Sequence, residues 1–193
     1  NMLQMNGQRM SKSTGNIINP AELMSGNNDI MSKSFSPSVI RFFNAQSSYR
    51  SVLDLTDDGL LASEKGFYRL MDAVNLLDDL KAGGTSTFNV TEWRQNCYDA
   101  MNDDFNSPIL IAHLFEASKQ INQIKTGNAS LTQDDLELLK KTMTEFIYDV
   151  LGLENSAKSE TGTDKLSAAV ELLIQLRQDA RANKDFAMSD KIR

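Results

Sequence analysis

The sequence predicts a mainly α-helical protein, in which a loop and short helices precede an antiparallel bundle of long helices. Apolar residues recur at spacings of three and four along several stretches, which is the period of one helix face. Asn-Pro and Ser-Pro pairs, together with glycines, mark where these helices begin and end. No run alternates apolar and polar side chains for long enough to predict a sizeable sheet. Long helices with short connections favour an antiparallel bundle.

The first part of the chain is predicted to hold a polar loop and two short helices. Residues 1–19 combine glycines with a Ser, Thr and Lys cluster, which is typical of a loop between short extended pieces. An Asn-Pro pair predicts the start of a helix over residues 19–24, and a Ser-Pro pair predicts another over residues 36–46. Residues 49–56 are interpreted as a connecting segment.

Four long helices are predicted to follow, over residues 56–82, 91–101, 107–127 and 132–152. Apolar faces are evident in the first, third and fourth of these helices. In that order they consist of Phe67, Leu70, Val74 and Leu77, of Leu110, Leu114, Ala117, Ile121 and Ile124, and of Leu136, Leu139, Met143, Phe146 and Val150. A Ser-, Thr- and Gly-rich segment precedes a last long helix over residues 164–182. We therefore divide the chain into a loop and stem-contact region, residues 1–55, and a helical bundle, residues 56–193.

Composition excludes several classes of protein. The 193 residues include 20 basic and 26 acidic side chains, a net charge of -6, which argues against simple coating of nucleic acid by a basic protein. A local basic face could still bind RNA, because counterion release depends on the residues at the contact. Cys97 is the one cysteine, so no internal disulfide is possible and a reducing cytosol fits. No apolar run predicts a membrane span, and the first residues do not resemble a signal peptide.

The most informative stretch is a cationic loop, residues 7–16, with the sequence Gly-Gln-Arg-Met-Ser-Lys-Ser-Thr-Gly-Asn. Arg9 and Lys12 offer two cations, and the hydroxyls and backbone amides beside them can donate hydrogen bonds to phosphate oxygens. The order of residues is not that of a Walker loop. Composition alone also fits a solvated basic surface loop. Met-Ser-Lys-Ser recurs at residues 31–34, where it leads into a helix cap and is interpreted as coincidence.

Residues 9–13 resemble the Lys-Met-Ser-Lys-Ser signature of class I aminoacyl-tRNA synthetases. In that family the loop closes on ATP, and its lysines stabilise the pyrophosphate as charge develops on it. The resemblance implies that Lys12 and Arg9 act in catalysis, and that Met10, Ser11 and Ser13 complete the ATP-binding loop. Arg9 stands where the family usually has its first lysine, which keeps the charge and changes the geometry.

Later blocks are similar to cysteinyl-tRNA synthetases in particular. They are Ser-Pro-Ser-Val-Ile-Arg-Phe-Phe at residues 36–43, Tyr-Arg-Ser-Val-Leu-Asp at 49–54, Ala-Met-Asn-Asp-Asp-Phe-Asn-Ser-Pro at 100–108 and the basic segment at 177–193. The resemblance implies a cytoplasmic, monomeric, ATP-dependent ligase that joins cysteine to tRNA(Cys) and does not bind membranes. It also implies that the bundle is of the type that binds the tRNA anticodon stem and loop.

The family's active-site motif, His-x-Gly-His, needs two histidines, and this chain has only His113. Zinc in that family is held by Cys, His and Glu ligands, and Cys97 with His113 on separate predicted helices cannot supply such a site. We therefore expect the catalytic nucleotide-binding domain, with its zinc, to lie outside this chain. The piece alone is expected to hold no metal and to activate no amino acid.

Five basic residues are candidates for contacts to tRNA. Arg177, Arg181 and Lys184 share one face if a helix continues past Asn183, although an ordinary solvated face is the alternative. Arg41 and Arg50 flank the segment that the resemblance brings to the inner side of the tRNA, and structural ion pairs would explain them equally well.

Four further side chains have plainer interpretations. Asp103 and Asp104 could form a metal or acid–base pair, but their place before Phe-Asn-Ser-Pro favours capping and turn roles. Trp93 and Tyr98 could stack on an RNA base, although their spacing favours core packing.

Two rival hypotheses for the protein remain: another class I synthetase such as the methionine enzyme, or a non-catalytic helical adaptor in which the match of residues 9–13 is accidental.

Overall fold

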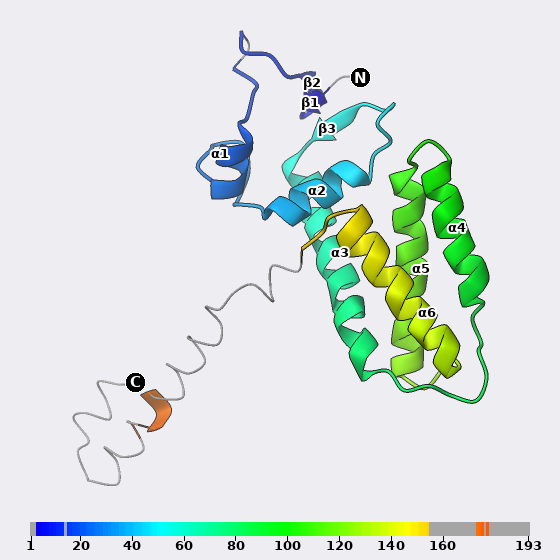
Figure 1. Cartoon of the computed structure of the whole chain (residues 1–193). Helices are drawn as coiled ribbons and strands as arrows, with labels where there is room; N and C mark the ends of the chain where they lie inside the picture. The colour runs from blue at the N-terminus through cyan, green and yellow to red at the C-terminus, as the bar shows by residue number, and fades with distance from the viewer. Residues whose placement is uncertain (1–2, 14, 155–172, 176, 178–193) are drawn as a thin grey trace. The chain divides into compact units, whose positions relative to one another are not determined.

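The computed structural model describes residues 3–13, 15–154, 173–175 and 177 (Figure 1). The chain divides into two compact units, Asn1–Glu154 and Asn155–Arg193. The first unit is mainly helical, so the predicted fold class is confirmed. Of the second unit, residues 173–175 and 177 are helical, and the rest of the helix predicted over 164–182 lies outside the described residues. The division between residues 55 and 56 stays a prediction.

The first unit contains three short strands and six α-helices among its described residues. In chain order they are β1 (Leu3–Met5), β2 (Gln8–Arg9), α1 (Pro20–Ser25), α2 (Pro37–Ala45), β3 (Leu53–Leu55), α3 (Asp57–Leu76), the 3-10 turn η1 (Leu77–Asp79), α4 (Val90–Asn102), α5 (Ser107–Lys125), α6 (Gln133–Thr144) and the π-helical turn η2 (Glu145–Val150).

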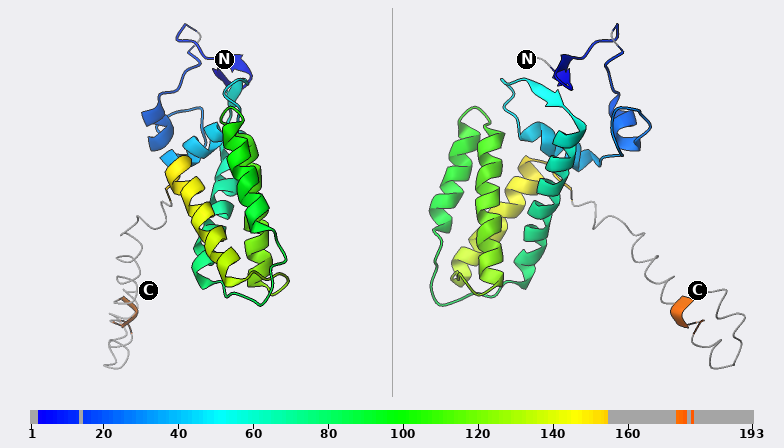
Figure 2. Two further views of the ribbon diagram at one scale, coloured as in Figure 1. Left: turned by 45° about the vertical axis from the view of Figure 1, so that its right-hand side comes forward. Right: turned by 180° about the vertical axis from the view of Figure 1, so that it is seen from behind.

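Helices α3, α4, α5 and α6 form the antiparallel bundle, and successive helices point in opposite directions (Figure 1). α5 packs against both α3 and α4, and α6 packs against α4 and α3, which closes the four helices into a ring (Figure 2). α2 lies across the end of the bundle against α3. One continuous apolar core runs from Met5 through Phe42 and Phe67 to Leu114 and Leu139, all buried. The bundle and the region that carries the cationic loop therefore share one core.

The helices begin at the predicted capping residues in most cases. The side chains of Asn19, Ser36 and Thr132 accept hydrogen bonds from backbone N–H groups in the first turns of α1, α2 and α6. α4 begins slightly earlier than predicted, at an Asn89 cap, and α5 begins after Asn106 without a side-chain cap. Such shifts of one or two residues reflect the weak definition of helix ends.

Loss of the cap of α3 is expected to destabilise the chain measurably. Thr56 Oγ1 accepts a hydrogen bond of 3.0 Å from the Gly59 N–H. Replacing Thr56 with alanine leaves that donor without its partner, so we expect a loss of about 1 kcal/mol in the free energy of unfolding. Urea unfolding followed by circular dichroism measures it. Thr56→Ser is the control, since it keeps the hydroxyl, and equal losses in both variants would contradict this explanation.

A small sheet joins the start of the chain to the segment before α3. β1 pairs antiparallel with β2 and parallel with β3. The hairpin turns at Asn6 and Gly7, whose φ angles of 52° and 75° match a type I′ turn. The parallel pair requires a crossover, and α1 and α2 lie in it. The sheet is small, as expected, but β3 occupies part of the predicted connecting segment at residues 49–56, because its pairing is set by a partner far away in the sequence.

Candidate functional site

The cationic loop leaves the sheet at the end of β2 and returns beside β1. Arg9, Lys12 and Ser13 are exposed, whereas Met10 is partly buried against the core. Among the described residues, neither Arg9 nor Lys12 forms an ion pair within 4.0 Å. Both cations therefore remain available to an anion from outside this part of the chain.

Hydrogen bonds within the loop make it a tight turn. The hydroxyls of Ser11 and Ser13 lie 2.7 Å apart, and the Ser13 N–H donates to Ser11 Oγ at 3.3 Å. The Gly15 N–H donates to the Lys12 carbonyl at 3.3 Å, and the φ of 66° at Gly15 is one that glycine adopts without steric cost. The turn is closed by the Ser11 N–H, which donates to the Asn16 carbonyl at 3.4 Å. Lys12 thus lies exposed in a small turn that is closed by hydrogen bonds between Ser11 and Asn16 and between Lys12 and Gly15.

Arg41 on α2 forms a hydrogen bond to the segment that follows η2 at the end of the bundle. Its guanidinium donates a hydrogen bond to the carbonyl of Gly152, which follows η2. The Glu154 N–H donates in turn to Ser38 Oγ of α2, at 3.0 Å. Arg41 is exposed beyond this contact. The structure therefore assigns it a structural bond that the sequence left open, while its contact with tRNA stays a prediction.

Arg50 takes part in an exposed polar bridge between the segment before β3 and the turn after α4. Its guanidinium lies 2.5 Å from Asp104 Oδ2, and its Nε donates to Tyr49 Oη at 3.1 Å. Tyr49 Oη donates to the same carboxylate at 2.6 Å. The hydrogen bond that Arg50 donates to Tyr49, and then the charge of Asp104, raise the pKa of Arg50 above its ordinary value. The Arg50 side chain is still 73% exposed, so the pair leaves donors facing solvent.

Asp103 and Asp104 lie in the turn between α4 and α5, as the sequence predicted. Asp103 follows the last residue of α4, and its N–H donates to the Asp99 carbonyl. Asp104 and Phe105 have positive φ angles, 56° and 54°, which are uncommon for residues other than glycine. Phe105 is 74% exposed at this turn. The Asp104 carboxylate bonds to Tyr49 and Arg50, and the Asp103 carboxylate accepts from Asn106 Nδ2 at 3.4 Å, which supports the turn roles that the sequence favoured.

Trp93 packs in the core, so the core interpretation is confirmed for this residue. It is 2% exposed, and its Nε1–H donates to the His113 carbonyl at 2.8 Å. Tyr98 is half-exposed, with its ring edge-on to Phe146 and the Arg94 guanidinium 4.9 Å from its centre. These contacts account for both aromatic residues without RNA.

Cys97 and His113 lie on neighbouring helices α4 and α5. Burial, helped by the charge of Glu116, raises the pKa of the Cys97 thiol to about 12, so the thiol stays protonated at neutral pH. His113 Nδ1 lies 3.5 Å from a Glu116 carboxylate oxygen. Within the described ranges, no three His, Cys, Asp or Glu side chains cluster as metal ligands. The residues present do not fit the Cys, His and Glu zinc site expected elsewhere in the family.

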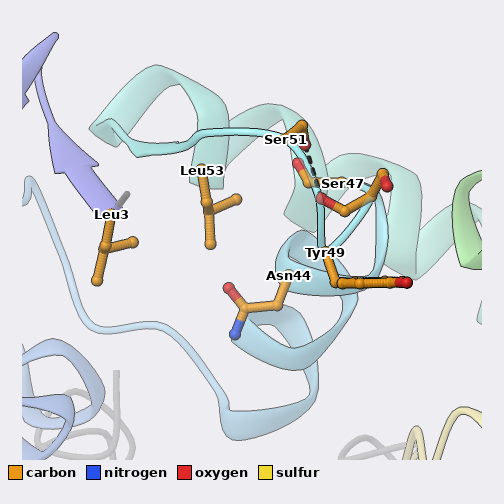
Figure 3. A pocket seen from close by; sticks show the side chains of 7 residues that line it. Leu3, Asn44, Ser47, Tyr49, Ser51 and Leu53 are labelled. Carbon is orange, nitrogen blue, oxygen red and sulfur yellow. Dashed lines mark hydrogen bonds between the residues drawn. The ribbon is translucent and has the colours of Figure 1, made fainter. Parts of the chain in front are cut away.

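A shallow pocket of about 260 Å³ lies between β1, the end of α2 and the segment before β3 (Figure 3). Leu3 and Leu53 form its apolar side, and Asn44 and Tyr49 belong to the rest of its wall. Ser51 Oγ donates to the Ser48 carbonyl at 2.7 Å in the same wall. The lining contains serines and a tyrosine but no carboxylate, histidine, cysteine or cation, so it offers no base that would activate a serine hydroxyl as a nucleophile.

Of the three basic residues predicted near the end of the chain to contact tRNA, only Arg177 lies among the described residues. Arg177 lies in a helical stretch of the second unit. Arg181 and Lys184 lie outside the described residues. Their common face therefore stays a prediction.

In the part of the chain that the structure describes, we find no helix long and apolar enough to span a bilayer.

Helices α4 to α6 and the turn η2 contain the residues that match a known domain family. Residues 96–155 match the DALR domain family, and they cover most of α4 together with α5, α6 and η2. The helical bundle is consistent with that assignment.

The whole chain is homologous to part of the cysteine–tRNA ligases. It is 44% identical over 194 residues to the cysteine–tRNA ligase of Porphyromonas gingivalis and 43% identical over 194 residues to that of Parabacteroides distasonis. It is 34% identical over 207 residues to the enzyme of Cytophaga hutchinsonii. Each match covers 100% of this chain and 40% of the relative, so the chain spans about 40% of the length of these relatives. The predicted resemblance is confirmed.

Proposed function

We propose that this chain is part of a longer protein that attaches cysteine to tRNA(Cys) with ATP. The observation that carries the proposal is the similarity to cysteine–tRNA ligases over every part of the chain, from the cationic loop to the bundle. Those relatives also favour the cysteine enzyme over the methionine enzyme. A helical adaptor with an accidental loop match is disfavoured, because the similarity extends over both the loop and the bundle.

In the proposed reaction, the carboxylate of cysteine attacks the α-phosphorus of ATP, and pyrophosphate leaves as the adenylate forms. Lys12 is exposed in the small turn and Arg9 is exposed in β2, and neither forms an ion pair within the described residues. Positive charge placed beside the leaving pyrophosphate stabilises the transition state more than the ground state, because negative charge builds up there. The hydroxyls of Ser11 and Ser13 would add hydrogen bonds to phosphate oxygens. The side chain of Met10, within the loop, packs against the hydrophobic core and would fix the position of the loop.

The bundle is proposed to bind the anticodon arm of the tRNA. Its proposed phosphate contacts are Arg177, Arg181 and Lys184. Arg41 and Arg50 precede the bundle and are the proposed contacts to the inner side of the tRNA. A guanidinium has five N–H donors, so Arg41 and Arg50 can keep their bonds to the protein and still contact a phosphate. The internal bonds would hold the two groups in place before the RNA arrives, which lowers the entropy lost on binding.

The remaining properties follow from the proposed activity. ATP and tRNA(Cys) are the partners, the cytoplasm is the compartment, and a monomer is the proposed assembly. Zinc is proposed to belong to the catalytic part of the longer protein.

The experiment that tests this function is amino-acid-dependent exchange of pyrophosphate into ATP by the longer protein. We expect exchange with cysteine and not with methionine, followed by charging of tRNA(Cys). Exchange with methionine alone would favour the rival synthetase, and the absence of both exchange and a tRNA footprint would favour the adaptor. The 193-residue chain serves as the matched control and is expected to show no exchange by itself.

A further inference from the structure

The Asp54 side chain holds the tip of the hairpin that leads into the cationic loop. Asp54 is the middle residue of β3, and the Gly7 N–H donates to both of its carboxylate oxygens at 3.0 Å. In the sheet register Asp54 stands opposite Gln4, which in turn stands opposite Arg9. The hydrogen bonds to the Asp54 carboxylate thus join β3 to the turn of the hairpin between β1 and β2.

The hairpin depends on this support. β1 and β2 are three and two residues long, and an isolated hairpin of that size is at best marginally stable in water. A hydrogen bond to an ionised carboxylate is stronger than one between neutral groups. One further hydrogen bond joins the hairpin turn to β3: the Asn6 N–H donates to the Leu55 carbonyl at 3.3 Å. β3 therefore holds β1 and the turn of the hairpin, and the loop departs from the other strand of that hairpin, β2.

The other side of the loop is tied to the same sheet. Asn16 Nδ2 donates to the Met5 carbonyl of β1 at 3.4 Å, and Ser11 pairs with Asn16 across the base of the loop. Both ends of the loop are thereby fixed on the sheet, while Lys12 stays exposed between them. Among these ties, Asp54 supplies the charged side chain, and it comes from a distant part of the sequence.

We propose that Asp54 is a positioning residue for adenylate formation, acting through the hairpin on Arg9 and Lys12. The inference rests on the proposed function of the loop. Electrostatic stabilisation requires the cations to sit where charge develops, and a misplacement of about 1 Å can cost roughly 10²-fold in rate. The carboxylate of Asp54 keeps the loop in register with the sheet, so its loss would lower the rate of activation without touching the binding of tRNA by the bundle.

The test compares Asp54→Ala with Asp54→Asn and Asp57→Ala in the longer protein. Asparagine keeps an oxygen that can accept from the Gly7 N–H. Asp57 is the matched control, because its carboxylate also accepts a backbone bond, from the Ser32 N–H at 2.9 Å, and does not contact the hairpin. We expect Asp54→Ala to lower kcat of cysteine-dependent pyrophosphate exchange by about 10- to 100-fold, with the KM for cysteine and the Kd for tRNA unchanged. Asp54→Asn should recover most of the rate, and Asp57→Ala should stay within about threefold of the parent.

Several outcomes would overturn the inference. The first is a kcat of pyrophosphate exchange in Asp54→Ala that stays within threefold of the parent. The second is an equal loss of kcat in Asp57→Ala, and the third is a kcat in Asp54→Asn that is as low as in Asp54→Ala. Circular dichroism and Tm check folding, and Asp54→Ser replaces the alanine variant if that one does not fold. Lys12→Ala, measured beside them, separates the two hypotheses. If Lys12→Ala is impaired and Asp54→Ala is not, the positioning role fails alone, whereas an unimpaired Lys12→Ala removes the proposed function of the loop.

Discussion

Replacing Lys12 with alanine in the longer protein is expected to slow adenylate formation by about 10²- to 10³-fold, the usual loss when one transition-state donor is removed. Lys12 is exposed and has no ion pair among the described residues, so its removal leaves no unpaired charge behind in this part of the protein. The loss should therefore appear in the rate of pyrophosphate exchange rather than in stability. The affinity for tRNA should stay within about threefold, because the proposed RNA contacts lie on other elements.

Two further variants make the Lys12 prediction specific. Lys12→Arg keeps the charge and changes its shape, so an intermediate rate is expected. Lys81→Ala removes another exposed lysine, which follows η1 at the far end of α3 from the sheet, and should leave the rate unchanged. If Lys12→Ala exchanges pyrophosphate as fast as the parent, the ammonium group plays no part in activation.

Local signals were sufficient to predict the helices. The stripe from Leu110 to Ile121 lies in α5, and Leu110, Leu114, Ala117 and Ile121 are all buried. The Asn-Pro and Ser-Pro pairs begin α1 and α2 as predicted. These features depend on residues a few positions apart, so a single sequence contains the information. Two helix ends were exceptions. The sequence predicted continuous helices to residue 82 and to Gly152, and gave no sign of the 3-10 turn η1 or the π-helical turn η2.

The parts that the sequence did not predict depend on distant partners. β3 forms because β1 lies beside it, and no local pattern in residues 53–55 requires a strand. The bond from Arg41 to the Gly152 carbonyl and the bridge from Arg50 to Asp104 join segments that only the tertiary fold brings together. For the candidate site, residue types and order were enough to single out the loop, but the support by Asp54 required the register of the sheet.

Replacing Phe42 with alanine is expected to cost about 3–5 kcal/mol of folding free energy, the largest stability effect predicted for this chain. Phe42 is fully buried where α2 meets the bundle. Its ring centre lies 6.0 Å from that of Phe67 on α3 and 6.3 Å from that of Phe115 on α5. Truncation would remove both aromatic contacts and leave a cavity, because the surrounding helices can only partly relax into the space. Urea unfolding of the 193-residue chain measures the loss.

Phe105→Ala is the matched control, since it removes the same side chain from a position that is 74% exposed. Its free energy of unfolding should change by less than about 0.5 kcal/mol, as for most surface substitutions. A loss of 3–5 kcal/mol is a large share of the total stability of a typical domain, so Phe42→Ala should loosen α2 together with the bundle. Because the sheet and the bundle share one core, the signals from both should be lost in one transition. If Phe42→Ala unfolds in the same single transition as the parent, with a free energy of unfolding within 1 kcal/mol of it, α2 is not part of that core.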